Sequence, residues 1–265
     1  MSPIYVPGKL VLLKESQPLD ADAEAYVNAV EVADGQRIED PVRFAINNFV
    51  LGCKNDGIWD AIKASCILAG ARTLDGALVP LVGTAPTNVS GLFVAGDYDR
   101  ETGLIGDGST KYLDSNRNNN ADPQNDNHNA AYVTSSGISP GFLMGATGPA
   151  CVNAGSNSLG DTGFSRSRSS TGTNVDVVAS TGFFGINRST ASSYIARAGS
   201  TNKTISVASN GLFDTNVLIY RRSCAGAPGY TDSRLAFYSI GESLDLALLD
   251  ARVTDLINAI GVAIP

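Results

Sequence analysis

Beyond residue 75 the chain consists of short apolar or alternating runs, and clusters of Gly, Asn and Ser separate each run from the next. Apolar runs of about four to eight residues between turn-forming residues indicate β-strands. A long series of such strands predicts an antiparallel β-sandwich or barrel. The expected strands are 77–82, 91–95, 111–113, 130–134, 141–144, 175–179, 182–186, 194–198, 204–208, 217–220 and 234–240.

Residues 20–75 have a helical pattern instead. Asp20 is a suitable N-cap for a first helix, and Gly35 is a suitable residue to end it. Asp40, which a proline follows, predicts the start of a second helix that Gly52 would end. Apolar residues at helical spacing between 58 and 69 predict a third helix, packed against the second as a hairpin.

Together these patterns predict a mainly β protein with three parts. Residues 1–19, which three prolines interrupt, are expected to form an extended N-terminal arm. Residues 20–75 are expected to form a small helical base. Residues 76–265 are expected to form the sandwich, closed by a C-terminal helix that Ser243 caps and that carries its apolar residues on one face.

The charge of the chain excludes some classes of partner. With a formal net charge of −7 and a pI of about 4.7, the chain lacks the basic surface of a nucleic-acid-binding protein. Residues 155–235 nevertheless contain eight Arg or Lys and only four Asp, which leaves an anionic ligand open there. No apolar run approaches the roughly 20 residues that span a bilayer, and the N-terminus does not resemble a secretory signal. We therefore expect the chain to fold in a cytoplasm and not to insert into a membrane.

The four cysteines are Cys53, Cys66, Cys151 and Cys224, and they are far apart in the sequence. None belongs to a C-x-x-C pair, so neither a zinc site nor a redox motif is predicted. In a protein that folds in a cytoplasm we expect all four to be reduced, buried thiols.

Catalytic groups are scarce. His128 is the only histidine, and it falls in a polar stretch, 114–129, that is expected to be a surface loop. A Ser-His-Asp triad would have to use this one residue. Glycosidase chemistry needs two positioned carboxylates, and none of the six glutamates shows the E-x-D-x-E spacing of glucanases with a lectin fold. The sequence therefore predicts a protein that is not an enzyme, with a glycan hydrolase as the third alternative for its function.

The same polar stretch supplies the candidate ligand-binding residues. Its Asn and Asp side chains offer oxygen ligands for calcium, but it lacks the glycine and the closing glutamate of an EF-hand, so turns are the expected role. No metal site and no cofactor are predicted. Arg166 and Arg168 lie in a Ser-rich stretch and are expected to be solvated, with contact to an anionic glycan or to a partner subunit as the alternative. The candidate binding residues are Asn116, Asn118, Asn125, Asp126, His128, Arg166 and Arg168.

Two segments resemble parts of the laminin-G-like and concanavalin A-like lectin domains. Residues 106–113 (GDGSTKYL) resemble the glycine-rich turn and early strand of those domains, and residues 235–244 (LAFYSIGESL) resemble their closing strand and the start of a short helix. The resemblance implies one antiparallel sandwich of the jelly-roll type. The chain departs from the calcium-dependent members of the family because no metal-ligand pattern is present, which argues against metal-dependent sugar binding.

The order of a helical lead-in, a lectin-like sandwich and an Asn-rich stretch resembles virion proteins of tailed bacteriophages, particularly tail or fibre components. This resemblance implies a structural protein of the virion that contacts other virion proteins, binds a host-surface glycan through sandwich loops and forms a homo-oligomer, with a trimer favoured. The alternative is a capsid decoration or cement protein that clamps head subunits and has no ligand.

Overall fold

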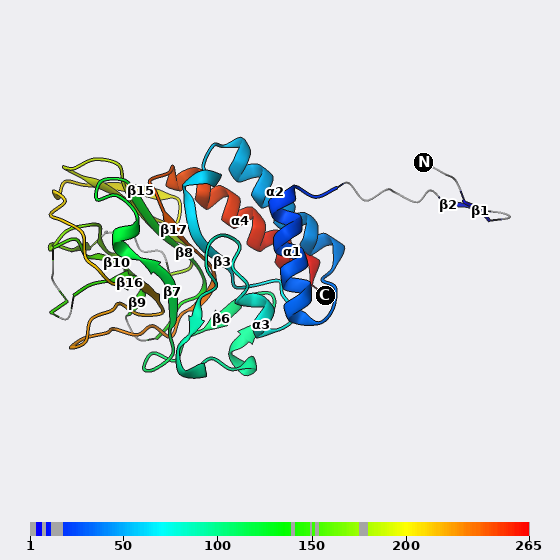
Figure 1. Cartoon of the computed structure of the whole chain (residues 1–265), viewed down its shortest axis with the longest axis horizontal. Coiled ribbons are helices and arrows are strands. Elements are labelled where there is room, and N and C mark those ends of the chain that lie inside the picture. Colours follow the sequence, from blue (N-terminus) through cyan, green and yellow to red (C-terminus); the bar gives the residue numbers. More distant parts are fainter. Residues whose placement is uncertain are drawn as a thin grey trace.

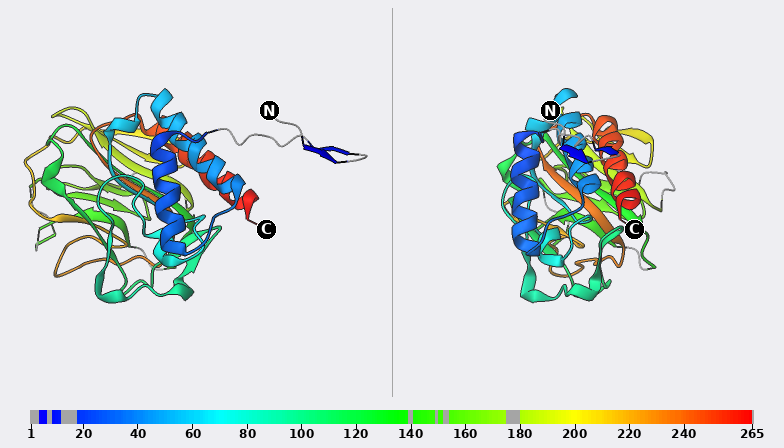
Figure 2. Two further views of the ribbon diagram at one scale, coloured as in Figure 1. Left: turned by 45° about the vertical axis from the view of Figure 1, so that its right-hand side comes forward. Right: turned by 90° about the vertical axis from the view of Figure 1, so that its right-hand side faces the viewer.

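The computed structural model describes residues 4–6, 9–11, 18–138, 141–148, 150–151, 154–174 and 180–264. The chain forms three layers, in which two antiparallel sheets face each other and helices cover the far face of one sheet (Figures 1 and 2). We call the sheet between the helices and the other sheet the inner sheet, and its partner the outer sheet. The predicted mainly β sandwich with N-terminal helices and a C-terminal helix is confirmed.

Among the described residues the outer sheet has seven strands and the inner sheet has eight. The outer sheet has the order β12 (Thr173–Asn174), β11 (Phe164–Arg166), β10 (Asn157–Gly160), β9 (Phe142–Ala146), β16 (Asn216–Ile219), β7 (Leu113–Asn118) and β4 (Thr87–Asn88). The inner sheet has the order β15 (Thr201–Ile205), β14 (Tyr194–Ala198), β13 (Gly182–Arg188), β8 (Asn127–Ser135), β17 (Arg234–Gly241), β6 (Gly103–Ile105) and β5 (Tyr98–Asp99), and β3 (Ile62–Ile67) also pairs with β17. A separate hairpin joins β1 (Ile4–Val6) to β2 (Lys9–Val11).

The helices pack on the inner sheet through one apolar core. They are α1 (Ala21–Asp34), α2 (Asp40–Asn55), α3 (Leu74–Ala77) and α4 (Leu246–Ala263). Phe49 of α2 meets Phe237 of β17 edge to face, with ring centroids 5.6 Å apart, in a cluster that also includes buried residues of α1 and α4. A second apolar core fills the space between the two sheets.

Several predicted helix ends are confirmed. The carboxylate of Asp20 accepts a hydrogen bond from the backbone N–H of Asp22, and Gly35 ends α1 with a φ of 67°. Gly52, however, does not end α2, which continues to Asn55. Arg252 of α4 lies against Gly52, where a β-carbon would approach its Cδ to 2.7 Å, so this glycine allows two helices to meet.

The prediction of a third helix between 58 and 69 is wrong. The chain makes a 3₁₀ turn, η1 (Trp59–Ala61), and then enters the inner sheet as β3. Ile62 and Ile67 face the helical core while Ala64 and Cys66 face the core between the sheets. A strand that is buried on both faces loses the alternation of polar and apolar residues, so its pattern resembles that of a buried helix.

The predicted strands fall into three groups. Those at 77–82 and 91–95 are wrong, because α3, η2 (Val89–Gly91), η3 (Ala95–Asp97) and loops occupy this part of the chain. Strand 175–179 lies outside the described residues. The others overlap β7, β8, β9, β13, β14, β15, β16 and β17, although the strand predicted at 111–113 shares only Leu113 with β7 and the one at 204–208 shares only two residues with β15. The closing strand and helix are β17 and α4, although Asp245 rather than Ser243 caps the helix.

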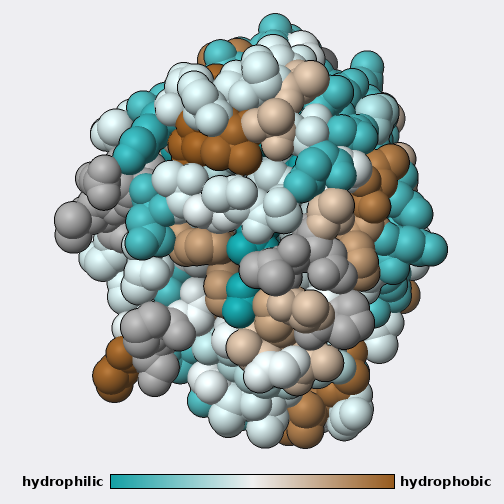
Figure 3. Space-filling view, turned by 90° about the vertical axis from the view of Figure 1, so that its left-hand side faces the viewer, coloured by the Kyte–Doolittle hydropathy of each residue, from teal (hydrophilic) through white to brown (hydrophobic). Residues whose placement is uncertain are grey.

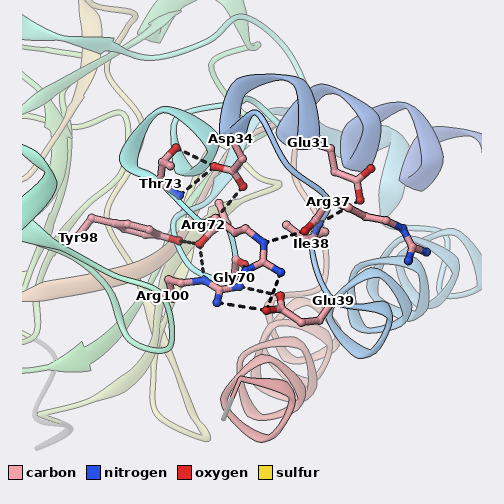
Figure 4. Close-up of polar contacts among 11 residues, drawn as sticks. Glu31, Asp34, Arg37, Ile38, Glu39, Gly70, Arg72, Thr73, Tyr98 and Arg100 are labelled. Atoms are coloured by element: carbon pink, nitrogen blue, oxygen red, sulfur yellow. Dashed lines mark hydrogen bonds and ion pairs between the residues drawn. The ribbon is translucent and has the colours of Figure 1, made fainter.

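A polar network fixes the turn between α1 and α2 to the loops beside β3 and β5 (Figure 4). The two carboxylate oxygens of Glu39 pair with Arg72 at 3.0 Å and with Arg100 at 2.7 Å. Asp34 accepts hydrogen bonds from the backbone N–H groups of Arg72 and Thr73. Burial by itself would raise the pKa of Glu39, but the hydrogen bonds and charges of its arginine partners hold it below its usual value. The network therefore ties the helical layer to the sandwich.

Candidate functional site

The predicted polar loop at 114–129 is mostly regular structure. It consists of β7, the 3₁₀ turn η4 (Asn119–Ala121) and the start of β8. The four predicted ligand-binding residues at 116–126 each have a partner within the chain: Asn116 Nδ2 donates to Ala85 O (2.8 Å), Asn118 Nδ2 to Asp214 Oδ1 (2.7 Å), Ser209 Oγ to Asn125 Oδ1 (2.6 Å) and Ser243 N to Asp126 Oδ1 (2.6 Å). Ligand binding by these residues stays a prediction, and their visible role is to hold neighbouring loops together.

His128 does not lie in a surface loop, and that prediction is wrong. It is a β8 residue with an exposed fraction of 0%. Its Nδ1 lies 2.5 Å from the carbonyl oxygen of Glu242, which only accepts, so Nδ1 carries the proton and Nε2 accepts from Ser239 Oγ at 2.7 Å. Burial lowers the pKa of His128 to about 4. Because Ser239 is also fully buried, this Ser–His contact is closed to a substrate.

The two candidate arginines are buried rather than solvated. The guanidinium of Arg168 donates to the backbone carbonyls of Asn119 and Asp122. Burial lowers the pKa of Arg168 to about 10. Because the guanidinium of Arg168 donates to backbone carbonyls inside the molecule, its role is to fix η4 against the strands of the outer sheet.

Arg166 lies in a different environment, on the face of the outer sheet that points away from the inner sheet. Its Nη1 donates to the carbonyl oxygen of Cys151 at 2.6 Å, and its guanidinium lies 5.5 Å from the ring centre of Phe164. The side chain is only 4% exposed, yet its Nε has no hydrogen-bond partner among the described residues. A buried donor without a partner costs about 1–3 kcal/mol, so a bound group or water at this point would stabilise the site.

Arg166 belongs to a group of four side chains on this face. Phe142 of β9 packs edge to face on Phe164 of β11, with ring centres 5.6 Å apart. The guanidinium of Arg222, just beyond β16, lies 4.1 Å from the ring centre of Phe142. We call Phe142, Phe164, Arg166 and Arg222 the arginine–phenylalanine quartet. Both rings are only half-buried, so the quartet presents apolar and cationic surface together.

Strand register places two buried hydroxyls beside the quartet. Ser158 of β10 lies opposite Arg166 on one side and opposite Gly145 on the other, so its side chain shares the face of the quartet. Arg222 crosses directly over Gly145, where a β-carbon would lie 3.0 Å from the Arg222 Cβ. Thr147 follows β9 and is bonded through its backbone to Ser223. The hydroxyls of Ser158 and Thr147 are buried and have no partner among the described residues.

A disulfide holds this region together. Cys151 and Cys224 are bonded, with Cα atoms 5.0 Å apart, so the prediction that all four cysteines are reduced is wrong for this pair. Cys53 and Cys66 are free and buried as predicted, and burial raises the pKa of each thiol to about 12. Because Cys151 also supplies the carbonyl that anchors Arg166, the disulfide helps to fix the quartet.

The quartet is a local concentration of positive charge in an acidic chain. Arg221, next to Arg222, lies between the rings of Tyr112 and Tyr230, 4.7 Å from each ring centre. None of the ion pairs among the described residues involves Arg166, Arg221 or Arg222. Figure 3 looks onto the side of the molecule where the outer sheet lies, and hydrophilic and hydrophobic patches adjoin one another there.

Other features of the described residues offer less chemistry. Trp59 is half-buried and lines two adjoining cavities of about 340 and 360 Å³, whose polar side chains include Asp22 and Lys54, already paired with each other. Among the residues that the structure describes, no group of three His, Cys, Asp or Glu side chains is placed to hold a metal ion. No helix among these described residues combines the length and apolar character needed to cross a membrane.

Comparisons with known proteins give only distant likenesses. No family model and no curated protein matches the sequence. Among solved structures, the NanB sialidase of Streptococcus pneumoniae matches 48% of this chain and 24% of its own, with 9% identity and a TM-score of 0.36. The binding domain of botulinum neurotoxin DC in complex with SialylT matches 57% of this chain and 39% of its own, with 13% identity and a TM-score of 0.33. At such scores these likenesses carry no weight for function.

Proposed function

We propose that this chain is a non-enzymatic module of a tailed-phage virion protein that binds a host-surface glycan through the arginine–phenylalanine quartet. The observation that carries the proposal is the pairing of two half-buried phenylalanine rings with two arginines that no described carboxylate neutralises. A sugar ring has an apolar face that suits an aromatic ring and hydroxyl groups that accept from a guanidinium fork. The binding residues of the proposal therefore differ from the candidates predicted from the sequence, most of which lie in the 114–129 stretch, and only Arg166 belongs to both sets.

The opposite side of the molecule suits assembly into a particle. An apolar groove of about 700 Å³ runs between α2 and α4, and its lining includes the exposed Phe44 and Val262, the latter 89% exposed. Exposed apolar surface of this kind is typical of protein–protein contact. In the proposal, this helical side contacts other virion proteins while the outer sheet remains free for glycan.

A glycan array of the purified chain tests the proposal, with Arg222→Gln as the test variant and Arg37→Gln as the matched control. Both variants lose one positive charge, but Arg37 lies on the helical side in an exposed ion pair with Asp40. We expect the wild type and Arg37→Gln to retain the same glycans, and Arg222→Gln to lose them.

Two results would overturn the proposal. If the folded wild type retains no glycan but binds empty phage heads saturably, the chain is a cement protein. If retained glycans become shorter on incubation, as measured by size-exclusion chromatography, the chain is a hydrolase.

A further inference from the structure

The quartet brings two cations together without an anion among the described residues. Burial is the main cause that lowers the pKa of the Arg166 guanidinium, and the charge of Arg222 lowers it further, so the two guanidinium groups repel each other. Like charges held together destabilise the folded chain unless an opposite charge lies between or beside them. An anion at this point would relieve the repulsion.

The unpartnered atoms around the quartet are donors. Arg166 Nε carries a proton and only donates, and the hydroxyls of Ser158 and Thr147 are free to donate. Only 4% of Arg166 is exposed, and the hydrogen bond from its Nη1 to the carbonyl oxygen of Cys151 holds the guanidinium plane in place. These donor atoms are closed to solvent, so they add positive potential near the half-buried guanidinium of Arg222, which is the group that a carboxylate can reach.

Resting on the proposed glycan-binding function, we infer that the quartet recognises an acidic sugar, whose carboxylate is bound by the half-buried guanidinium of Arg222, next to the fixed charge of Arg166, while its ring lies against the phenylalanines. The glycan is then a polysaccharide that carries uronic-acid-type carboxylates. Buried water is the alternative partner for the orphaned donors, and it would give the site no preference for an acid.

The inference is tested by calorimetric titration with three carboxylated polymers, polygalacturonate, alginate and hyaluronate, and with the carboxyl-reduced form of each. We expect wild type to bind at least one acidic polymer about tenfold or more tightly than its reduced form, because charge-assisted hydrogen bonds are lost on reduction. Binding should weaken as salt is raised. Dextran sulfate is expected to bind more weakly than the carboxylated polymer.

Variants connect the preference to the quartet. Arg222→Gln should remove most of the difference between acidic and reduced polymer, Arg222→Lys should restore part of it, and Arg37→Gln should leave it unchanged. Circular dichroism and the thermal midpoint of each variant show whether it folds, so loss of the preference in a variant that melts like wild type is a property of the site.

The outcomes separate this inference from the proposed function. Equal binding of acidic and reduced polymers, or tighter binding of dextran sulfate, overturns the acidic-sugar inference while glycan binding stands. Failure of the folded wild type to bind any acidic, reduced or arrayed glycan overturns both. An acid preference that survives Arg222→Gln unchanged shows that the carboxylate is bound elsewhere and overturns the assignment to the quartet.

Discussion

At the scale of single residues, the fold buries polar side chains that the sequence places in apparently exposed stretches. His128 and Arg168 lie among Asn, Asp and Ser residues, which are normally typical of surface loops. Their partners are distant in the sequence, since the carbonyl that binds His128 belongs to Glu242 and the carbonyls that bind Arg168 belong to residues 119 and 122. Local composition therefore predicts the polar residues of this region but not their burial.

The buried histidine makes stability depend on pH. Its pKa is about 4 in the folded chain and 6.5 when exposed, so the unfolded chain binds the extra proton and the stability present at pH 7 is lost as the pH falls from about 6.5 towards 4. The loss in free energy of unfolding is on the order of 3 kcal/mol. Urea denaturation at pH 7 and at pH 5 should show roughly 2 kcal/mol of this loss, because pH 5 lies inside the window.

The control for this prediction is His128→Gln, because the chain has no second histidine. This variant should be less stable at pH 7 but should show a much smaller difference between the two pH values. An equal difference in both proteins would assign the effect to carboxyl groups and contradict the role given to His128.

At the scale of elements, Glu39 connects the helical layer to the sandwich through Arg72 and Arg100. Glu39→Gln leaves two half-buried arginines with weaker partners, and we expect a loss of about 1–3 kcal/mol in the free energy of unfolding. Arg37→Gln removes only an exposed ion pair, so its loss should stay below about 1 kcal/mol. If chemical denaturation gave the same loss in free energy of unfolding for both variants, the network would contribute no more to stability than an exposed ion pair.

The disulfide acts on two elements at once, because it joins residues 73 apart and lies beside the anchor of Arg166. Cys151→Ser with Cys224→Ser should lower the free energy of unfolding by about 2–4 kcal/mol. It should also weaken glycan binding, since the carbonyl that holds Arg166 is no longer fixed.

Alkylation of the unreduced folded chain, read by mass spectrometry, should modify no cysteine, because the other two are buried. A modified Cys151 or Cys224 would contradict the pairing.

The elements differ in how far the sequence predicts them. Short apolar strands with turn-forming residues at their ends, such as β13 and β17, and helices with clear caps, such as α1, were predicted within a few residues. β3 was predicted as a helix because the apolar residues between 58 and 69 also fit a helical spacing, and a strand buried on both faces has no alternation that would distinguish it. Of the quartet, only Arg166 was a candidate. Phe142, Phe164 and Arg222 come from three separate parts of the chain, and only strand pairing brings them together.

At the scale of the whole molecule, the two sides have different surfaces, with an apolar groove on the helical side and a cationic, aromatic face on the outer sheet. The predicted homo-oligomer, with a trimer favoured, would bury the groove. Sedimentation velocity should then show a trimer for the wild type and a smaller species for Val262→Asp. A monomeric wild type at high concentration would contradict the prediction.

The central claim is that the outer sheet is the ligand-binding face, and amide hydrogen exchange with and without a retained glycan tests it most directly. We expect the glycan to slow exchange in β9, β11 and the residues around Arg222 and to leave α1, α2 and α4 unchanged. Slower exchange confined to the helices would contradict the claim. So would slower exchange in the 114–129 stretch when exchange in β9, β11 and the residues around Arg222 does not change.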